Sequence, residues 1–279
     1  DRKQVRKILR RESIDILHTH LSHDHWTAVS AGGKESPLVV RTFHLVRHIR
    51  CDLFHRRFCY ERTNGFFSVS ENIRVHCEKE ARIPKARTFA LRGTVDTDFF
   101  KPGTGNTAIR KRLGLTSAGP VVGTVSRLAP NRGHLSLLEA FVQVRAKFPE
   151  AQLLLTGKGE YRETIIQRAK TLGLQPGREV ILTGYWDGDL RDILCLLDVF
   201  VLQSAGSEGT ARALLEAMAF GLPAIVTRTD GMDDIVEDET SGIVVPPSDS
   251  GALSTKLISL LQDQNRAKII GQKARERAT

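Results

Sequence analysis

Short apolar runs separated by longer amphipathic segments recur along the chain, and this alternation predicts strands joined by helices. In the second half, strands are expected at 121–125, 152–156, 180–183, 199–203, 224–227 and 243–245. Helices are expected at about 134–148, 160–172, 188–197, 210–220, 231–237, 249–262 and 265–277. Apolar strands joined in this way by helices are typical of an α/β domain with a doubly wound parallel sheet.

The first third of the chain shows the same alternation. Strands are expected at 14–18, 38–43, 65–70 and 88–91. Helices are expected over 2–11, from about Asp24, from Leu45 to about Tyr60, and from near Glu71 to Pro84. The segment from Lys101 to Asn106 contains a proline and two glycines, so we expect an interdomain boundary there. The sequence thus predicts a first domain over 1–102 and a second over 103–279.

Composition narrows the class of protein. The chain has 279 residues, of which 41% are hydrophobic, and its longest apolar runs are strand-sized, so neither a membrane span nor a signal peptide is expected. The four cysteines form no Cys-x-x-Cys pair, which fits a reducing cytoplasm. The formal charge of +9 favours anionic partners such as nucleotide phosphates or a membrane surface. Nucleic acid is disfavoured, because the few aromatic residues are not interleaved with the basic runs.

The stretch from Ser207 to Pro223 suggests the chemistry. An apolar strand leads into a Ser/Gly turn, and a run of helix formers then begins at about Thr210. Free N–H groups at this helix start, with the positive end of its dipole, would bind an anion. Glu208 lies in the turn and Glu216 about two helical turns later. Because a carboxylate repels a nearby anion, Glu208 would accept hydrogen bonds from hydroxyl groups instead. An anion with several hydroxyl groups describes a sugar nucleotide.

Glu208 and Glu216, followed by Ala-Met-Ala-Phe-Gly-Leu-Pro, resemble the signature of the family 4 retaining glycosyltransferases of the GT-B fold. The resemblance implies two Rossmann-like domains facing a cleft, with Glu208 at the transferred sugar and Glu216 at the ribose. It also implies transfer from a nucleotide sugar to a glycan or lipid-linked acceptor with retained anomeric configuration, in cell-surface polysaccharide or lipopolysaccharide synthesis. Gly209 and Thr210 fall where the family's backbone contacts the diphosphate, although Gly-Thr-Ala replaces the usual Gly-Phe-Gly.

The resemblance covers nearly the whole chain. The family's first strands and Gly-rich acceptor loop have no counterpart before Ile14, so we expect an incomplete first domain. A chain lacking them would still bind the donor and yet be inactive.

A second motif runs from Gly123 to Gly133 and resembles the family's Gly-x-x-x-Arg-Leu-x-x-x-Lys-Gly. Gly123 allows a close backbone approach, and the resemblance implies that Arg127 and Arg132 bind the donor diphosphate, with Arg132 in the lysine place. Gly157 and Trp186 close neighbouring strands and resemble the base-side loops. Two arginines and a helix start can neutralise the charge of a leaving nucleoside diphosphate, so no metal or other cofactor is expected.

Histidines mark the first domain. His18, His20, His23 and His25 come near the His-x-His-x-Asp-His pattern of metallo-β-lactamase-like hydrolases, with Ser22 in the aspartate place, so a metal-dependent hydrolase is an alternative. His44 follows the strand 38–43, at the end of a parallel sheet where ligands bind. Arg-Thr-Phe-His44 resembles the family strand that ends in a cleft histidine, which contacts the donor sugar near the reacting carbon. Asp96 resembles part of the family's interdomain link and is interpreted as structural.

The first domain is also basic over residues 2–11 and 45–62. In the helix expected from Leu45, apolar residues at 46, 49 and 53 and arginines at 47, 50 and 57 form separate stripes. This pattern predicts peripheral docking on anionic lipid at the inner face of the plasma membrane; a solvated face with its apolar stripe in the core is the alternative. A non-catalytic basic module that docks on membranes is the remaining functional alternative.

Overall fold

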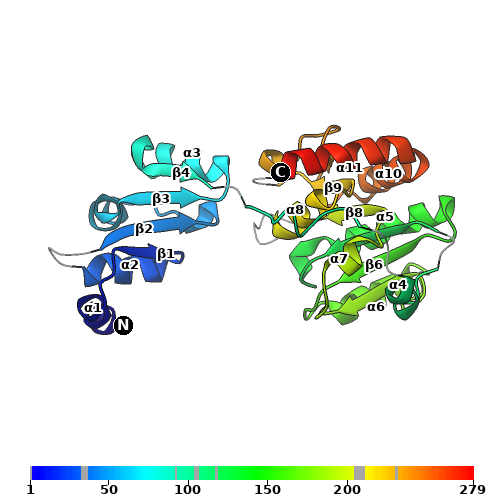
Figure 1. Cartoon of the computed structure of the whole chain (residues 1–279), viewed down its shortest axis with the longest axis horizontal. Helices are drawn as coiled ribbons and strands as arrows, with labels where there is room; N and C mark the ends of the chain where they lie inside the picture. The colour runs from blue at the N-terminus through cyan, green and yellow to red at the C-terminus, as the bar shows by residue number, and fades with distance from the viewer. Residues whose placement is uncertain are drawn as a thin grey trace. The chain divides into compact units, whose positions relative to one another are not determined.

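The computed structural model describes residues 2–32, 37–91, 93–103, 107–116, 119–203, 211–229 and 232–279. The chain divides into two compact units, Asp1–Gly93 and Thr94–Thr279, both drawn in Figure 1. Each unit contains one parallel sheet whose strands alternate with helices along the chain. No helix in the described part of the chain is both long enough and apolar enough to cross a bilayer.

The first unit has a sheet in which the described strands lie in chain order, β1-β2-β3-β4. Its strands are β1 (Ile16–Thr19), β2 (Leu38–Phe43), β3 (Gly65–Ser68) and β4 (Thr88–Ala90). Its helices are α1 (Arg2–Arg11), α2 (Ser22–Ala31) and α3 (Glu71–Lys79). Phe43, Phe66 and Ile73 lie in its buried core. Alternating strands and helices around one parallel sheet are Rossmann-like.

The helix expected from Leu45 to Tyr60 does not form as one element, so that prediction is wrong. Val46–His48 forms a single 3₁₀ turn, and Ile49 is extended. A second helical segment starts at residue 53 and is π-helical over His55–Cys59 and 3₁₀ over Tyr60–Arg62. The break arises because Ile49 is buried and the Tyr60 hydroxyl accepts a hydrogen bond from the Arg50 N–H at 3.0 Å.

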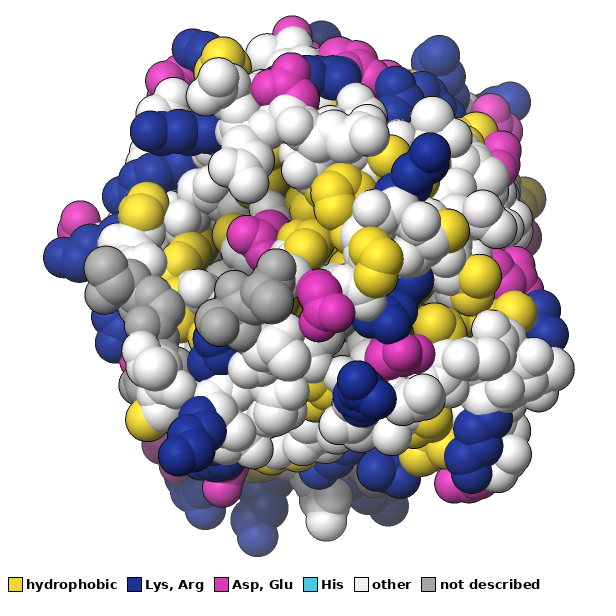
Figure 2. All heavy atoms as spheres, turned by 90° about the vertical axis from the view of Figure 1, so that its right-hand side faces the viewer, with side chains coloured by type: hydrophobic (Ala, Val, Ile, Leu, Met, Phe, Trp, Pro, Cys, Tyr) yellow, Lys and Arg dark blue, Asp and Glu magenta, His cyan; other side chains and the backbone are white. Residues whose placement is uncertain are grey.

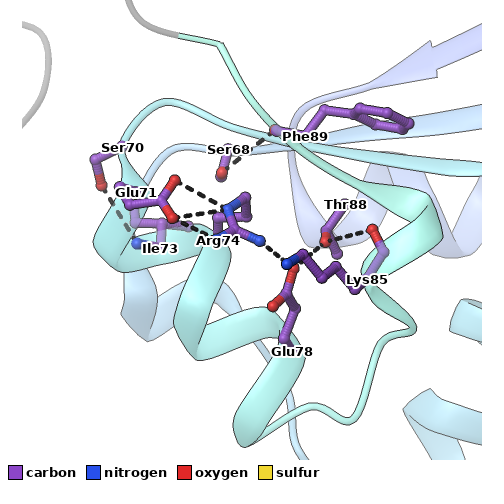
Figure 3. Close-up of polar contacts among 9 residues, drawn as sticks. All are labelled: Ser68, Ser70, Glu71, Ile73, Arg74, Glu78, Lys85, Thr88 and Phe89. Carbon is purple, nitrogen blue, oxygen red and sulfur yellow. Dashed lines mark hydrogen bonds and ion pairs between the residues drawn. The ribbon is translucent and has the colours of Figure 1, made fainter.

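The start of α3 is fixed by side-chain capping (Figure 3). The Ser70 hydroxyl accepts a hydrogen bond from the Ile73 N–H at 3.3 Å and begins α3. Arg74 pairs with Glu71 and Glu78, and the Thr88 hydroxyl donates to Glu78, which ties α3 to β4. The helix expected from about Asp24 begins two residues earlier, at Ser22, and Asp24 accepts from the Leu21 N–H at 3.3 Å from within the first turn of α2.

The second unit has a parallel sheet with the strand order β10-β9-β8-β5-β6-β7 among its described residues. The strands are β5 (Val121–Val125), β6 (Gln152–Thr156), β7 (Val180–Gly184), β8 (Val199–Leu202), β9 (Ala224–Thr227) and β10 (Ile243–Val245). This is the doubly wound order, and it reverses direction between β5 and β8. Ligands of such sheets bind beyond the carboxyl ends of the strands at this reversal.

Helices cover both faces of this sheet (Figure 1). They are α4 (Thr107–Arg112), α5 (His134–Lys147), α6 (Arg162–Thr171), α7 (Arg191–Leu194), α8 (Ala211–Ala219), α9 (Met232–Ile235), α10 (Ser250–Gln262) and α11 (Gln264–Ala278). In β8, Phe200 packs into the core cluster that contains α8, whereas Val201 packs into the cluster that contains α5 and α10. The sequence does not predict α4, and the helix expected over 188–197 is reduced to α7, which Asp189 starts by accepting from the Arg191 N–H.

The segment before Pro102 belongs to the second unit, so the units divide earlier than the sequence predicts. Phe100 is buried in the core of the second unit, and Arg275 Nη1 donates to its carbonyl oxygen at 3.0 Å. Asp96 accepts hydrogen bonds from the Asp98 and Phe99 N–H groups at 3.1 and 2.9 Å, which fixes a turn. The burial of Phe100 in the second unit is not evident from the positions of proline and glycine, and the boundary between the units lies at Gly93.

Candidate functional site

A pocket of about 790 Å³ opens at the carboxyl ends of β5, β6 and β7 and is closed on one side by α8. Four residues that the sequence singles out line it: Arg127, Gly157, Trp186 and Glu216. Lys158, Glu160 and Tyr185, from the two loops that resemble the family's base-side loops, line it as well. Arg212 also lines it, and the sequence does not single out this residue. The pocket has the size of a small-molecule site and lies at the sheet edge where doubly wound folds bind ligands.

Arg127 follows β5 and extends into this pocket from a fixed backbone. The N–H groups of Ser126 and Leu128 donate to the carbonyl oxygens of Thr156 and Lys158, each at 3.0 Å. Leu128 is fully buried, whereas the Arg127 side chain is two-thirds exposed and pairs with Glu160 at 3.0 Å. The guanidinium group is therefore held at the pocket wall by a partner that solvent screens and an anionic ligand can replace.

Two glycines allow the loop after β6 to press against the loop after β5. Gly157 has φ +145°, and a Cβ atom there would lie 2.0 Å from the Ser126 carbonyl oxygen. A Cβ atom at Gly159 would lie 2.0 Å from the Leu128 carbonyl oxygen. Glycine is required at both positions to form this wall of the pocket. The sequence points to Gly157 but gives no reason to expect the matching contact at Gly159.

Arg132 lies in the 3₁₀ turn Pro130–Arg132, just before α5. Partial burial lowers the pKa of Arg132, and the nearby charge of Arg127 lowers this pKa further. Two guanidinium groups that repel each other stabilise an anion placed between them. Among the described residues, Arg132 is not part of the pocket lining, so the structure puts it near Arg127 but not on the same wall.

His134 is a buried positioning residue that the sequence does not reveal. It begins α5, and its Nε2–H donates to the Arg127 carbonyl oxygen at 3.2 Å. Burial lowers the pKa of His134, so the imidazole is neutral. The preceding Gly133 has φ +65°, and a Cβ atom there would lie 2.3 Å from Cβ of Gln203. The start of α5 is therefore fixed against both β5 and the residue after β8.

Close packing against Leu197 explains why glycine occupies position 123. Gly123 lies within β5, and a Cβ atom there would lie 2.3 Å from Cδ2 of Leu197. The close approach that its sequence position indicates is to this leucine side chain. Its assignment to donor binding stays a prediction.

Glu216 is carried by α8 and is 5% exposed. Its Oε1 accepts from Arg212 Nε at 2.9 Å, and the Arg212 side chain is 84% exposed. The i, i+4 spacing of the two residues on a predicted helix is the signal that would have drawn attention to Arg212. Among the described residues, this nearly buried carboxylate contacts a solvent-exposed partner, and a carboxylate oxygen can accept from a ligand's hydroxyl groups. Glu208, Gly209 and Thr210 lie outside the described residues.

Aromatic and cationic side chains form a further part of the pocket lining. Trp186 Nε1 donates to the Asp189 carbonyl oxygen at 3.0 Å, and the Arg112 guanidinium lies 4.7 Å from the centre of one of its rings. Trp186 is therefore fixed by contacts on its polar edge and on its face. Tyr185 is 68% exposed, with Lys158 Nζ 5.0 Å from its ring centre. An exposed ring beside a cation suits a planar, anionic ligand such as a nucleotide.

Four histidines of the first unit lie at two separate places: His18, His20 and His44 at one, and His25 at the other. His44 follows β2, and its Nε2 lies 2.9 Å from His20 Nδ1, so one ring donates to the other. His18 Nε2 lies 2.8 Å from the Thr42 hydroxyl oxygen. His25 instead lies in the core, where its Nδ1 accepts from Arg41 Nη1 at 2.7 Å. Each of these rings has a protein partner at hydrogen-bond distance.

The four-histidine cluster therefore does not form the metal site of the hydrolase alternative. The Thr63 hydroxyl donates to the Cys59 carbonyl oxygen, so it accepts from His25 Nε2–H and fixes a neutral ring. Burial, and then the Arg41 charge, lower the pKa of His25 to about 3. Across the described ranges, no three His, Cys, Asp or Glu side chains are grouped so that they could hold a metal ion.

Two Rossmann-like units with a pocket at the sheet reversal define the GT-B class of glycosyltransferases, and comparison with known proteins identifies the family. The chain belongs to the family "Glycosyl transferases group 1", whose model matches residues 105–277. A second model, "Glycosyltransferase Family 4", matches residues 1–99.

Among curated relatives, a GDP-mannose-dependent monoacylated alpha-(1-6)-phosphatidylinositol monomannoside mannosyltransferase of Corynebacterium glutamicum is 36% identical over 190 residues. The match covers 65% of this chain and 49% of that protein. The UDP-Gal:alpha-D-GlcNAc-diphosphoundecaprenol alpha-1,3-galactosyltransferase of Escherichia coli is 26% identical over 270 residues. This match covers 92% of this chain and 69% of that protein. The chain thus spans about half the length of the mannosyltransferases that it matches.

Among solved structures, a glycosyltransferase from Rickettsia africae matches with a TM-score of 0.87 at 20% identity, covering 99% of this chain and 75% of that one. The Anabaena protein HepE, solved in complex with UDP and glucose, matches with a TM-score of 0.83 at 19% identity, and the match covers 99% of this chain and 76% of that one. At these identities the likeness shows the fold, and it confirms the α/β, GT-B class expected from the sequence.

Proposed function

We propose that the second unit binds a nucleotide sugar and that the whole protein transfers the sugar to a lipid-linked or glycan acceptor with retained anomeric configuration. The observation that carries the proposal is the pocket at the sheet reversal, where Arg127, Trp186 and Glu216 converge. A cation, an aromatic ring and a nearly buried carboxylate match the diphosphate, base and ribose of one ligand. The family and the names of the relatives support the same class of donor.

The diphosphate lies beside Arg127 in this proposal, with Arg132 close enough to share its charge. Arg127 exchanges its exposed Glu160 partner for a phosphate oxygen, which forms a stronger, charge-assisted pair. The anion also relieves the repulsion between the two guanidinium groups, which contributes to lowering the pKa of Arg132. When the glycosidic bond breaks, the same cations stabilise the charge that develops on the leaving diphosphate.

The nucleoside occupies the rest of the pocket. Glu216 accepts hydrogen bonds from the ribose hydroxyl groups, and the base lies towards Gly157, Tyr185 and Trp186. Glu208 and His44 contact the transferred sugar, and the N–H groups of Gly209 and Thr210 contact the diphosphate, as the family resemblance implies. Donor binding requires no metal in this proposal; an unchanged nucleoside diphosphate affinity in the presence of a chelator tests that part.

The acceptor side is proposed from the relatives. Their names specify a phosphatidylinositol mannoside, a diphosphoundecaprenol-linked sugar and lipopolysaccharide core, so we infer a membrane-associated acceptor used in surface glycan synthesis. A cytoplasmic protein docked peripherally on the inner face of the plasma membrane would meet both such an acceptor and a soluble donor. The four cysteines, all of them among the described residues, form no disulfide, which suits a reducing compartment.

Calorimetric titration with nucleoside diphosphates tests the donor site. Replacing Arg127 or Arg132 by Ala should lower diphosphate affinity by about 1.5–3 kcal/mol, the usual contribution of a charge-assisted hydrogen bond. Neither change should alter affinity for the free nucleoside, whereas Glu216→Gln should lower it. Unchanged diphosphate affinity in both arginine variants would remove the diphosphate from this loop. A chain that binds anionic lipid but no nucleotide would instead be the non-catalytic docking module.

A further inference from the structure

An exposed apolar patch lies on the first unit, formed by Trp26 of α2 and by Leu53, Phe54 and Phe58 of the helical segment that ends at Arg62. Their exposed fractions are 37%, 78%, 48% and 45% respectively. The ring centres of Trp26 and Phe54 are 5.3 Å apart, and those of Phe54 and Phe58 are 5.0 Å apart. Large apolar side chains that touch one another at the surface mark a contact site more often than isolated ones do.

The patch is held rigidly by the unit on which it lies. The same helical segment buries Cys59 and Tyr60, so it is apolar on its inner and outer sides alike. Arg56 Nη2 donates to the Glu80 carbonyl oxygen at 2.7 Å, which fixes the segment to the residue that follows α3. The outward phenylalanines therefore cannot turn into the core of this unit.

The segment that carries most of the apolar patch has a net positive charge. Residues 50–62 contain four arginines (Arg50, Arg56, Arg57 and Arg62) but only two acidic residues (Asp52 and Glu61). Both acids are paired, Asp52 with His55 at 2.8 Å and Glu61 with Arg57 at 3.0 Å. The basic helix α1 is close to α2, because Arg6 donates to the Ser30 and Ala31 carbonyl oxygens, one turn after Trp26. On the face drawn in Figure 2, by contrast, Lys and Arg are interspersed with Asp and Glu.

We propose that the apolar patch inserts into the headgroup region of an anionic bilayer while the arginines around it bind lipid phosphates. A second copy of the chain fits less well, because a self-complementary contact through this patch would bring like-charged arginines together. Aromatic side chains flanked by cations instead match a surface that is apolar below and anionic above. This proposal rests on the peripheral location proposed above. The membrane-binding element is then the pre-formed apolar patch, and not the continuous amphipathic helix expected from Leu45 to Tyr60.

Tryptophan fluorescence tests the insertion directly, because Trp26 and Trp186 are the two tryptophans of the chain. With vesicles of phosphatidylglycerol and phosphatidylcholine in equal parts, emission should shift to the blue and be quenched by brominated acyl chains. Trp26→Phe should abolish this quenching, since Trp186 lies in the pocket of the other unit. Phosphatidylcholine alone should give no shift, and salt should weaken binding by screening the arginines.

A matched pair of variants distinguishes insertion of the patch from nonspecific hydrophobic adsorption to vesicles. The double change Leu53→Ser and Phe58→Ser should weaken vesicle binding by about tenfold or more, as expected for losing two apolar side chains from the interface. Ile269→Ser, which alters a residue of α11 that is 58% exposed, should leave binding unchanged. Each variant should keep its affinity for nucleoside diphosphate, which shows that the second unit is folded, and the double variant should keep the far-UV circular dichroism and unfolding midpoint of the wild type, which report on the first unit as well.

Three results would overturn the proposal: equal vesicle binding by the double variant and the wild type, vesicle-bound protein whose Trp26 is not quenched, or a blue shift that grows with protein concentration in the absence of lipid. The last would identify a self-association surface. Because nucleoside diphosphate binding is measured in the same preparations, loss of lipid binding alone leaves the proposed donor site intact.

Discussion

Gly157→Ala is the change for which the structure gives the sharpest expectation. The residue has φ +145°, and the new Cβ atom would lie 2.0 Å from the Ser126 carbonyl oxygen. This oxygen belongs to the backbone that carries Arg127, so it cannot move without shifting the pocket wall. Strain at such a φ costs about 1–3 kcal/mol. Relieving the contact adds about 1–3 kcal/mol, as for other overpacked sites.

Gly177→Ala is the matched control. Gly177 also has a positive φ, +87°, but no atom of the described residues other than its chain neighbours lies within 4 Å of its Cβ position. It carries the backbone strain without the contact, so Gly157→Ala should be the more destabilising by about 1–3 kcal/mol in denaturant unfolding. Calorimetry should also show weaker nucleoside diphosphate binding for Gly157→Ala only. Equal unfolding free energies, with donor affinity unchanged in both variants, would refute the reasoning.

The remaining predictions concern single side chains. Glu160→Gln should raise nucleoside diphosphate affinity with little change in stability, because it releases Arg127 from an exposed pair; weaker binding in calorimetry would contradict this. Ser70→Ala should destabilise the protein by about 1 kcal/mol through loss of the α3 cap, and an unchanged unfolding midpoint would argue against that cap. The pKa of buried His25 is about 3, below its ordinary value of 6.5, so the unfolded chain binds the extra proton. Stability should therefore fall as pH drops from about 6.5 towards 3, and His25→Asn should flatten this slope in unfolding measured across that range.

The second unit could be predicted from sequence because its strands are buried on both faces. Runs such as Leu153–Leu155 and Val199–Leu202 are continuously apolar and lie between predicted helices. Arg127, Gly157, Trp186 and Glu216 meet in one pocket because a parallel sheet brings the carboxyl ends of its strands to one edge. The sequence does not reveal His134 and Gly159 because their partners come from other loops. It does not single out Arg212 because this side chain lies on the exposed face of α8.

The segment after β2 shows where pattern reading fails. Val46, Ile49 and Leu53 have helical spacing, yet Ile49 is buried and extended while Leu53 is exposed. Hydrogen bonding between Arg50 and Tyr60 and the start of a new helical segment after Asp52 override the periodicity. The basic and apolar character of this segment was evident from its residues. Its arrangement as a patch with Trp26 depended on a tertiary contact.

The most direct test of the donor site is a crystal structure of the protein with a nucleoside diphosphate. The account predicts diphosphate oxygens within hydrogen-bond distance of the Arg127 guanidinium, with Arg127 released from Glu160. It also predicts ribose hydroxyl groups on the Glu216 carboxylate and the base towards Tyr185 and Trp186. A nucleotide bound with its ribose away from Glu216, or outside the pocket at the ends of β5, β6 and β7, would contradict the central claim.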